Sequence, residues 1–465
     1  MYMSRKLTMF MIVAAVVGIF AACENKSAVI EPSIKREEEI APDNRAKEAD
    51  NNSQGENLFV AADEKRMENL KKDIDNLSKQ LSAYVKLFYD IENSAEDRAL
   101  SERVHEELEK LYTDMENLDD FHIALRLQFI SAMFHDGHMV TDFIFSDYYE
   151  TSYPIYFNIF EEEPYCIAVY NEEYENMLNC KAVAINGVEI DEIFERFRLL
   201  FSGDNIYNSR QWFGRCLHCP AILKALDIIK NIDDPALFTL VDSAGNSFDM
   251  QIEQNLTSMW VDEISSRVKG GEAYYNSKDE LVWMDYLRED KLMYVRMYYI
   301  PASNELSGMD NALNGILENN EIDKIVVDLR GNEGGMVASI RSGFFDTLIS
   351  CGAENGNLYV ITDHDTFSMG ATIAMYLKEK GGATVIGLAS GGAKPYIGAP
   401  RNIMISGLGF AIIIPTQNSY KNGAVDFVPT LENNSLEPDI EIGISIEDYV
   451  NKKDPVLDLI KAIGR

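Results

Sequence analysis

The hydrophobic pattern of the chain has three successive textures, and the first is helical. Over residues 63–149, apolar side chains recur every three or four positions, and the polar positions between them form the opposite face. The segments SERVHEELEKLYTDMENL and FHIALRLQFISAMF continue this pattern up to the loop HDGH. These residues are therefore predicted to form an N-terminal helical domain. The apolar face of its first helix carries Met67, Leu70, Ile74, Leu77 and Leu81.

The second texture, over residues 150–255, is one of short strands. CKAVAINGVEIDEIFERFRLLF predicts a strand, an Asn-Gly turn, a short strand and a helix, and ALFTLVDSAGNSFDMQIE predicts a hairpin around Gly245. This mixture indicates a small PDZ-like module, a fold that binds an extended peptide at a sheet edge.

The third texture, over residues 256–465, alternates apolar strands with helices. A run such as KIVVDL is apolar at nearly every position, which is typical of a strand buried on both faces of a parallel sheet. The alternation predicts right-handed crossovers and an α/β domain. The predicted strands are DKLMYVRMYYI, DKIVVDL, LYVITD, ATVIGLA and FAIIIPTQ, and one predicted helix runs through ASIRSGFFDTLISCG.

The N-terminus has the pattern of an export signal. Arg5 and Lys6 precede an apolar stretch, and small residues stand just before Cys23. This pattern is similar to a bacterial lipoprotein signal over residues 1–22, with Cys23 as the lipid-bearing residue, and the apolar run is short for a spanning helix. Residues 23–62 are polar and charged, which predicts a flexible acidic tether. We therefore expect an extracytoplasmic protein, anchored by lipid to the bacterial cell membrane.

The composition of the chain argues against several classes of function. The 465 residues include 76 acidic and 42 basic side chains, a formal net charge of −34, which argues against nucleic-acid binding. Five cysteines follow Cys23, an odd number that does not indicate a disulfide framework. The pair Cys216 and Cys219 in CLHC lacks the second pair that a structural zinc site requires, so we interpret its spacing as chance and expect no metal.

Ser368, in VITDHDTFSMGATIAMYLKEKGG, lies in a turn between a predicted strand and a predicted helix. A serine there is commonly a helix cap. It can also be a nucleophile, because the turn exposes its hydroxyl and leaves the amide of Met369 free to donate to an oxyanion. The pattern G-x-S-x-G is absent, so partners must decide between the two interpretations.

The loop in VVDLRGNEGG is the first such partner. It lacks the Lys-Ser/Thr of a phosphate-binding loop and the G-x-G-x-x-G of a dinucleotide site. Gly334 and Gly335 would let the backbone approach a ligand and offer an amide to an oxyanion. The alternative is a plain turn in which Asp328 and Arg330 form a structural pair.

Together with SLEPDIEI near the C-terminus, the segments around Gly334 and Ser368 resemble the tail-specific, or C-terminal processing, serine peptidases and the related tricorn protease core. INGVEIDEIF resembles the PDZ-like segment of that family, and DGH resembles the loop that supplies a histidine in the tricorn-like branch. The resemblance implies a crotonase-like core over 256–465, with an inserted PDZ-like module.

The resemblance also implies site residues. In the tricorn-like pattern, Ser368 is the nucleophile, His138 the base and Glu432 the orienting acid, with Gly334, Gly335 and Met369 around the oxyanion. In the processing-protease branch the base is a lysine, and the alternative base is then Lys394. His364, four residues before the serine, is a further alternative base.

The sequence thus predicts a lipid-anchored serine endopeptidase that acts on extended or unfolded peptides through an acyl-enzyme and needs no cofactor. The oligomeric state is left open. The competing interpretation is a peptide-binding lipoprotein of the same fold without activity.

Overall fold

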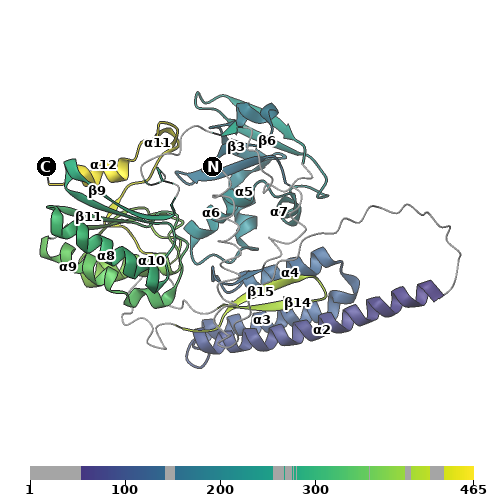
Figure 1. Ribbon diagram of the computed structural model, residues 1–465. Coiled ribbons are helices and arrows are strands. Elements are labelled where there is room, and N and C mark those ends of the chain that lie inside the picture. The colour runs from purple at the N-terminus through teal and green to yellow at the C-terminus, as the bar shows by residue number, and fades with distance from the viewer. Residues whose placement is uncertain are drawn as a thin grey trace, which may run out of the picture.

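The computed structural model describes three packed units (Figure 1). The described residues are 54–141, 152–254, 266–267, 275, 277–278, 280–355, 357–392, 400–418 and 434–464, and in a few of these only the backbone is described. The predicted signal at 1–22, Cys23, Lys394 and Glu432 lie outside these ranges. Within them, no helix is both long and apolar enough to cross a membrane.

The first unit is helical. It contains α2 (Gln54–Phe88), α3 (Ala95–Asp114) and α4 (Asp120–Ala132), whose apolar faces pack together. Ser94 and Asp119 cap α3 and α4 by accepting a backbone N–H of the first turn. Helix α2 begins at Gln54, before the boundary at 62 that we predicted for the tether, because the segment up to Glu64 contains helix-forming Leu and Ala and no proline.

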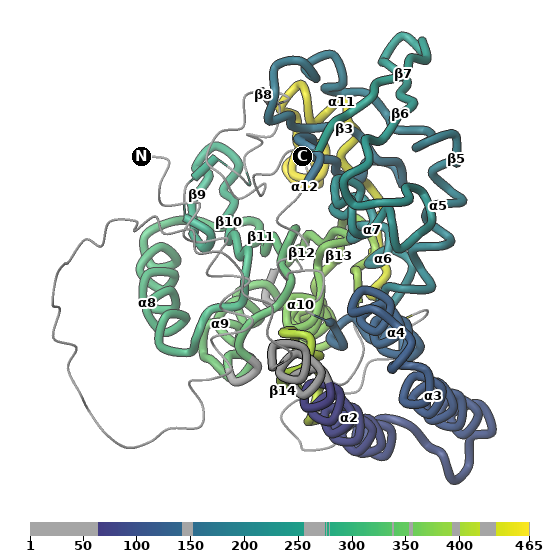
Figure 2. Tube along the Cα trace, turned by 90° about the vertical axis from the view of Figure 1, so that its right-hand side faces the viewer, coloured from purple at the N-terminus to yellow at the C-terminus, as the bar shows by residue number. Residues whose placement is uncertain are grey.

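A hairpin from the C-terminal half of the chain completes this helical unit. Strands β14 (Pro400–Ile405) and β15 (Phe410–Pro415) pair antiparallel, and β15 also pairs with β1 (Val140–Thr141). The prediction that FAIIIPTQ belongs to the α/β sheet is therefore wrong. Its apolar residues instead contact α2 and α4 in one buried cluster, which periodicity along the chain does not reveal. Figure 2 shows β14 beside α2.

The second unit is a small antiparallel sheet in the order β2-β3-β4-β6-β7, in which β5 also pairs with β4 and β8 also pairs with β3. The predicted strand, short strand and helix are β4, β5 and α5, and the predicted hairpin is β6–β7. Its core is rich in fully buried phenylalanine. The bounds are β2 (Ile155–Phe160), β3 (Glu163–Val169), β4 (Lys181–Ile185), β5 (Val188–Glu189), β6 (Ala236–Val241), β7 (Ser247–Ile252), β8 (Ser266–Arg267), α5 (Ile190–Arg198), α6 (Ile206–Cys216) and α7 (Pro220–Ala225).

The third unit is the predicted α/β domain, a sheet in the order β16-β13-β12-β11-β10-β9. All neighbouring pairs are parallel except β9–β10. The strands are β9 (Val282–Leu287), β10 (Leu292–Met297), β11 (Lys324–Asp328), β12 (Leu358–Thr362), β13 (Thr384–Gly387) and β16 (Ile440–Glu441). The helices are α8 (Ser303–Asn319), α9 (Gly343–Asn355), α10 (Met369–Gly381), α11 (Ile446–Val450) and α12 (Pro455–Ala462).

Both faces of this sheet are covered, as the apolar strands require. Helices α8, α9 and α10 lie on one face, where Val327 and Val360 are buried, and α12 lies on the other, against Val326 and Ile361 (Figure 1). The helix predicted through ASIRSGFFDTLISCG is divided, because Ser342 has an extended backbone between a short 3-10 turn and α9.

Candidate active site

Ser368 has a strained backbone at the start of α10. Its φ of 53° and ψ of −122° lie in a region that non-glycine residues rarely adopt, at a cost of about 1–3 kcal/mol. Its side chain makes no capping hydrogen bond to the helix, so the helix-cap interpretation is wrong. The hydroxyl is therefore left for another partner.

That partner is His138, which lies 230 residues earlier in the chain. His138 Nε2 is 2.8 Å from Ser368 Oγ, within the range of a nucleophile–base hydrogen bond. The imidazole packs on the ring of Phe367, with centroids 4.6 Å apart. His138 belongs to the loop between α4 and β1, so the helical unit brings the histidine to the serine of the α/β unit.

Sequence analysis missed Asp136. This aspartate is fully buried, and its Oδ1 lies 3.2 Å from His138 Nδ1 and accepts the backbone N–H of His138 at 2.9 Å. The hydroxyl of Tyr84, on α2, donates to its Oδ2. The signal in the sequence is the aspartate two residues before the histidine in HDGH, whereas the family resemblance implies Glu432 as the acid.

The small β unit fixes the same loop through the segment between α5 and α6. Ser202 Oγ accepts the amide N–H of Asp136 at 2.8 Å and donates to the Asp136 carbonyl at 2.7 Å. Asp204 Oδ1 accepts the amide N–H of Gly137 at 2.7 Å. Because Ser202 and Asp204 are buried, these bonds are shielded from water and restrict the position of His138.

The glycine loop lies against the serine. A Cβ at Gly334 would be 2.9 Å from Ser368 Cβ and 3.1 Å from both Ser368 Oγ and Met369 N, so only glycine leaves this space open. Gly334 and Gly335 have φ values of +121° and +152°, which favour glycine. A side chain at Gly335 would collide with the backbone of Ile300.

The three amides predicted around the oxyanion differ in their partners. The N–H of Gly334 donates to Asn332 Oδ1 at 2.9 Å and is already engaged. Within the described part of the chain, the N–H groups of Gly335 and Met369 make no hydrogen bond. Those two amides are therefore the ones available to an oxyanion.

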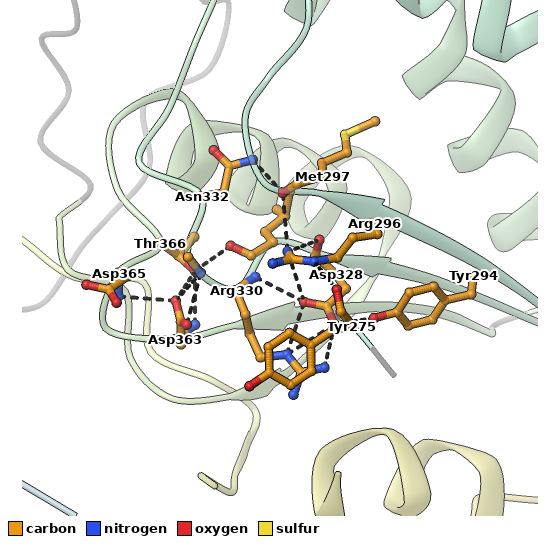
Figure 3. A network of polar contacts seen from close by, with 12 residues as sticks. Tyr275, Tyr294, Arg296, Met297, Asp328, Arg330, Asn332, Asp363, Asp365 and Thr366 are labelled. Atoms are coloured by element: carbon orange, nitrogen blue, oxygen red, sulfur yellow. Dashed lines mark hydrogen bonds and ion pairs between the residues drawn. The ribbon is translucent and has the colours of Figure 1, made fainter. Parts of the chain in front are cut away.

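A buried polar network lies at the end of β11, next to the glycine loop (Figure 3). Arg330 pairs with Asp328 and with Asp454, the residue that caps α12, so the predicted structural pair is present. Burial alone would raise the pKa of Asp328, but the nearby guanidinium groups of Arg330 and Arg296 lower it below its usual range. The carboxylate is thus charged and fixed at the point where β11 enters the loop.

Two side-chain contacts define the conformation of the loop itself. Asn332 Nδ2 donates to the Met297 carbonyl at 2.9 Å, and Asp363 accepts the amide N–H of Gly331 at 2.9 Å (Figure 3). Arg215, from α6 of the small β unit, pairs with Glu333 at 2.5 Å and with Asp365 at 2.8 Å. Arg215 therefore connects the glycine loop to the turn that carries the serine.

His364 is engaged elsewhere. Its Nδ1 lies 2.7 Å from the Ala389 carbonyl and its Nε2 lies 3.1 Å from Glu162 Oε1, and its ring stacks on Tyr207 at 4.4 Å. Burial is the largest influence and acts to lower the pKa of His364, but the hydrogen bonds to Glu162 and the Ala389 carbonyl and the charges of Glu162 and Asp363 together outweigh it, and the pKa is raised. Since both ring nitrogens contact other groups, the geometry does not support His364 as the base.

The CLHC pair does not have the character of a redox or metal site. Cys216 and Cys219 are buried, and burial raises the pKa of both thiols, to about 12 for Cys216. Burial lowers the pKa of the intervening His218 to about 4. These groups are therefore neutral, and protonated thiols are poor nucleophiles and ligands.

One grouping of possible metal ligands occurs among the described residues. Ligand atoms of Asp136, His138 and Asp204 lie within 4.8 Å of one another. The hydrogen bonds given above already engage these three side chains in holding the histidine loop.

Comparison with solved structures identifies the fold. The chain is similar to the crystal structure of mature CPAF, with a TM-score of 0.54 and 10% sequence identity over 86% of this chain and 99% of that one. The structure of mature CPAF complexed with lactacystin gives a TM-score of 0.54 and 9% identity over 85% and 98%. The tricorn protease matches with a TM-score of 0.41 and 15% identity over 85% of this chain and 36% of that chain.

No protein-family model and no curated protein sequence matches the chain. The structural neighbours also include a photosystem II D1 C-terminal processing protease. The predicted resemblance is confirmed as one of fold, because mature CPAF, at a TM-score of 0.54, shares the mixed α/β architecture of several sheets.

Proposed function

We propose that this protein is a serine endopeptidase that cleaves extended or unfolded peptide segments. The observation that carries the proposal is the 2.8 Å contact of His138 Nε2 with the hydroxyl of Ser368, whose backbone is strained in a partly buried turn. The shared fold with mature CPAF and the presence of proteases among the structural neighbours agree with this proposal.

The reaction follows from the geometry. Ser368 Oγ attacks the scissile carbonyl carbon while its proton passes to His138 Nε2, and the amides of Gly335 and Met369 donate to the oxyanion. Collapse of the tetrahedral intermediate breaks the C–N bond, and the departing amine takes the proton from His138. Water, deprotonated by His138, then attacks the ester carbonyl carbon. Collapse of this second intermediate breaks the bond to Ser368 Oγ, which takes the proton back from His138, and the acid is released. The family resemblance implies Glu432 as the orienting acid, and this residue lies outside the described ranges.

The substrate would bind as an extended strand. We assign the α/β unit to the crotonase-like type and the small β unit to the PDZ-like type, on the basis of strand order and the β4–β5–α5 succession. A peptide that adds to a sheet edge gains affinity from main-chain hydrogen bonds, so its sequence is only loosely specified. The signal pattern before Cys23 adds that the enzyme is exported and held at the membrane by lipid.

Mass spectrometry after treatment with a fluorophosphonate tests the proposal. The full-length protein should gain one adduct, which is absent from Ser368→Ala and forms at least 100-fold more slowly in His138→Ala. Labelling that survives His138→Ala but not Lys394→Ala would assign the base to Lys394. A folded protein that gains no adduct would contradict the peptidase proposal and favour the peptide-binding lipoprotein.

A further inference from the structure

We infer that Asp136, supported by Tyr84 of the N-terminal helix α2, is the carboxylate that orients His138. The inference rests on the proposed function and names a further residue for the same site. It also gives the helical unit a part in the chemistry.

The first step concerns the tautomer of His138. To accept the proton of Ser368 at Nε2, a neutral imidazole must carry its own proton on Nδ1. That proton needs an acceptor, and Asp136 Oδ1 lies 3.2 Å from Nδ1. An ionised carboxylate only accepts hydrogen bonds, so it favours the tautomer that the reaction requires.

The second step concerns how Asp136 is held. Its Oδ1 also accepts the backbone N–H of His138 at 2.9 Å, and its Oδ2 accepts the hydroxyl of Tyr84. Both oxygens thus have donors, as a fully buried carboxylate requires. The ring of Tyr84 is itself fixed by an edge contact with Phe134, at a centroid distance of 5.2 Å.

The third step concerns charge. When Ser368 attacks, His138 becomes an imidazolium, and a carboxylate in contact with Nδ1 stabilises that cation. Asp136 supplies this carboxylate in a site that excludes water, where the attraction is stronger than in solvent. Asp204 is a second carboxylate nearby, but its Oδ1 accepts from Gly137 and so fixes the loop.

The test compares Asp136→Asn with Glu432→Gln in the full-length protein, with the fluorophosphonate labelling rate measured across pH. We expect Asp136→Asn to label at least 100-fold more slowly than the parent and at least tenfold more slowly than Glu432→Gln. Its half-maximal rate should also move to lower pH, because the imidazolium has lost its carboxylate. A purely structural role would not move this midpoint.

A second pair of variants covers the case in which Asp136→Asn does not fold. Tyr84→Phe removes only the hydroxyl that contacts Asp136 and should slow labelling about three- to tenfold. Tyr112→Phe on α3, where the exposed ring makes no described contact with the site, is the matched control and should label at the parent rate.

Two results would overturn the inference. One is a Glu432→Gln variant that labels as slowly as Asp136→Asn or more slowly. The other is labelling at the parent rate in Asp136→Asn or, if that variant does not fold, in Tyr84→Phe. Either result leaves the peptidase proposal intact as long as the parent gains its adduct at Ser368. A parent that gains none refutes the proposed function itself.

Discussion

At the scale of single residues, the site depends on backbone conformations that few side chains tolerate. Ser368 adopts a positive φ to present its hydroxyl, and Gly334 lies against it with a φ of +121°. Such strained conformations persist only when the surrounding structure determines them. Here Asn332 supplies part of that support, because it bonds to the Gly334 amide and to the Met297 carbonyl.

Gly334→Ala should therefore reduce the labelling rate of Ser368 by at least about 100-fold, the loss typical of a missing oxyanion donor. The added methyl would lie 3.1 Å from Ser368 Oγ and from Met369 N, where the oxyanion is expected. The control is Gly245→Ala, which has a positive φ but no neighbour within 4 Å and should keep the parent rate. Unchanged labelling in Gly334→Ala would contradict the assigned oxyanion site.

At the scale of elements, the hairpin β14–β15 is the least expected component. In the sequence it lies between β13 and β16 of the α/β sheet, but it packs on α2 and α4, and β15 pairs with β1, which begins two residues after His138. A segment far along the chain therefore fixes the end of the histidine loop. The hairpin links the stability of the helical unit to the position of His138.

Ile412→Ala should destabilise the protein by about 2–5 kcal/mol, the usual cost of a large cavity in a core. Ile412 is fully buried and pairs with Thr141, so the same variant should also slow labelling of Ser368. Denaturant unfolding and labelling kinetics measure the two effects. Met404→Ala, at a half-exposed position of β14, is the control and should change neither by much. A hairpin independent of the site would lose stability without loss of rate.

At the scale of the whole molecule, the site lies where all three units meet. The helical unit supplies His138, the α/β unit supplies Ser368, and the small β unit binds both loops through Asp204 and Arg215. The relative position of the units therefore decides whether the site is assembled.

Arg215→Met should slow labelling about tenfold, because it leaves Glu333 and Asp365 facing each other without the guanidinium that joins their loops. The stability lost should be about 1–3 kcal/mol. Arg198→Met, which breaks an exposed pair with Glu195, should cost less than about 1 kcal/mol and leave the rate unchanged. Equal rates for Arg215→Met and the parent would show that the glycine loop keeps its position without this contact.

The contact between His364 and Glu162 makes the joining of two units depend on pH. The raised pKa of His364 means that its stabilisation is present at low pH and is lost as pH rises through that pKa. The pKa of Glu162 is lowered, chiefly by His364, so its contribution is lost only in acid. The pair should therefore stabilise the protein most in mildly acidic solution.

The melting temperature of His364→Gln should accordingly fall below that of the parent by about 2–4 °C near pH 6, and by less near pH 9. His105→Gln, an exposed substitution on α3, is the control and should show no such pH dependence. A difference that is the same at both pH values would mean that packing on Tyr207, and not charge, stabilises this contact.

The sequence alone determined the local structure, because periodicity, turn residues and caps act within an element. It located the strand KIVVDL, the hairpin around Gly245 and the turn at Ser368. It also excluded phosphate binding by the glycine loop, because the phosphate motif is missing. Sequence also identified the pair His138 and Ser368, but only through resemblance to a family. Their 2.8 Å contact is described only by the structure.

Only the tertiary structure decided which distant segments meet. The hairpin β14–β15 packs on the N-terminal helices. Asp136 contacts His138 Nδ1 and accepts a hydrogen bond from the hydroxyl of Tyr84. Arg215 connects two loops of the α/β unit. The hydrophobic periodicity of a helix or strand describes only that element. Contacts between units therefore cannot be predicted from it. They depend on which apolar faces bury one another and on which buried polar groups then find partners.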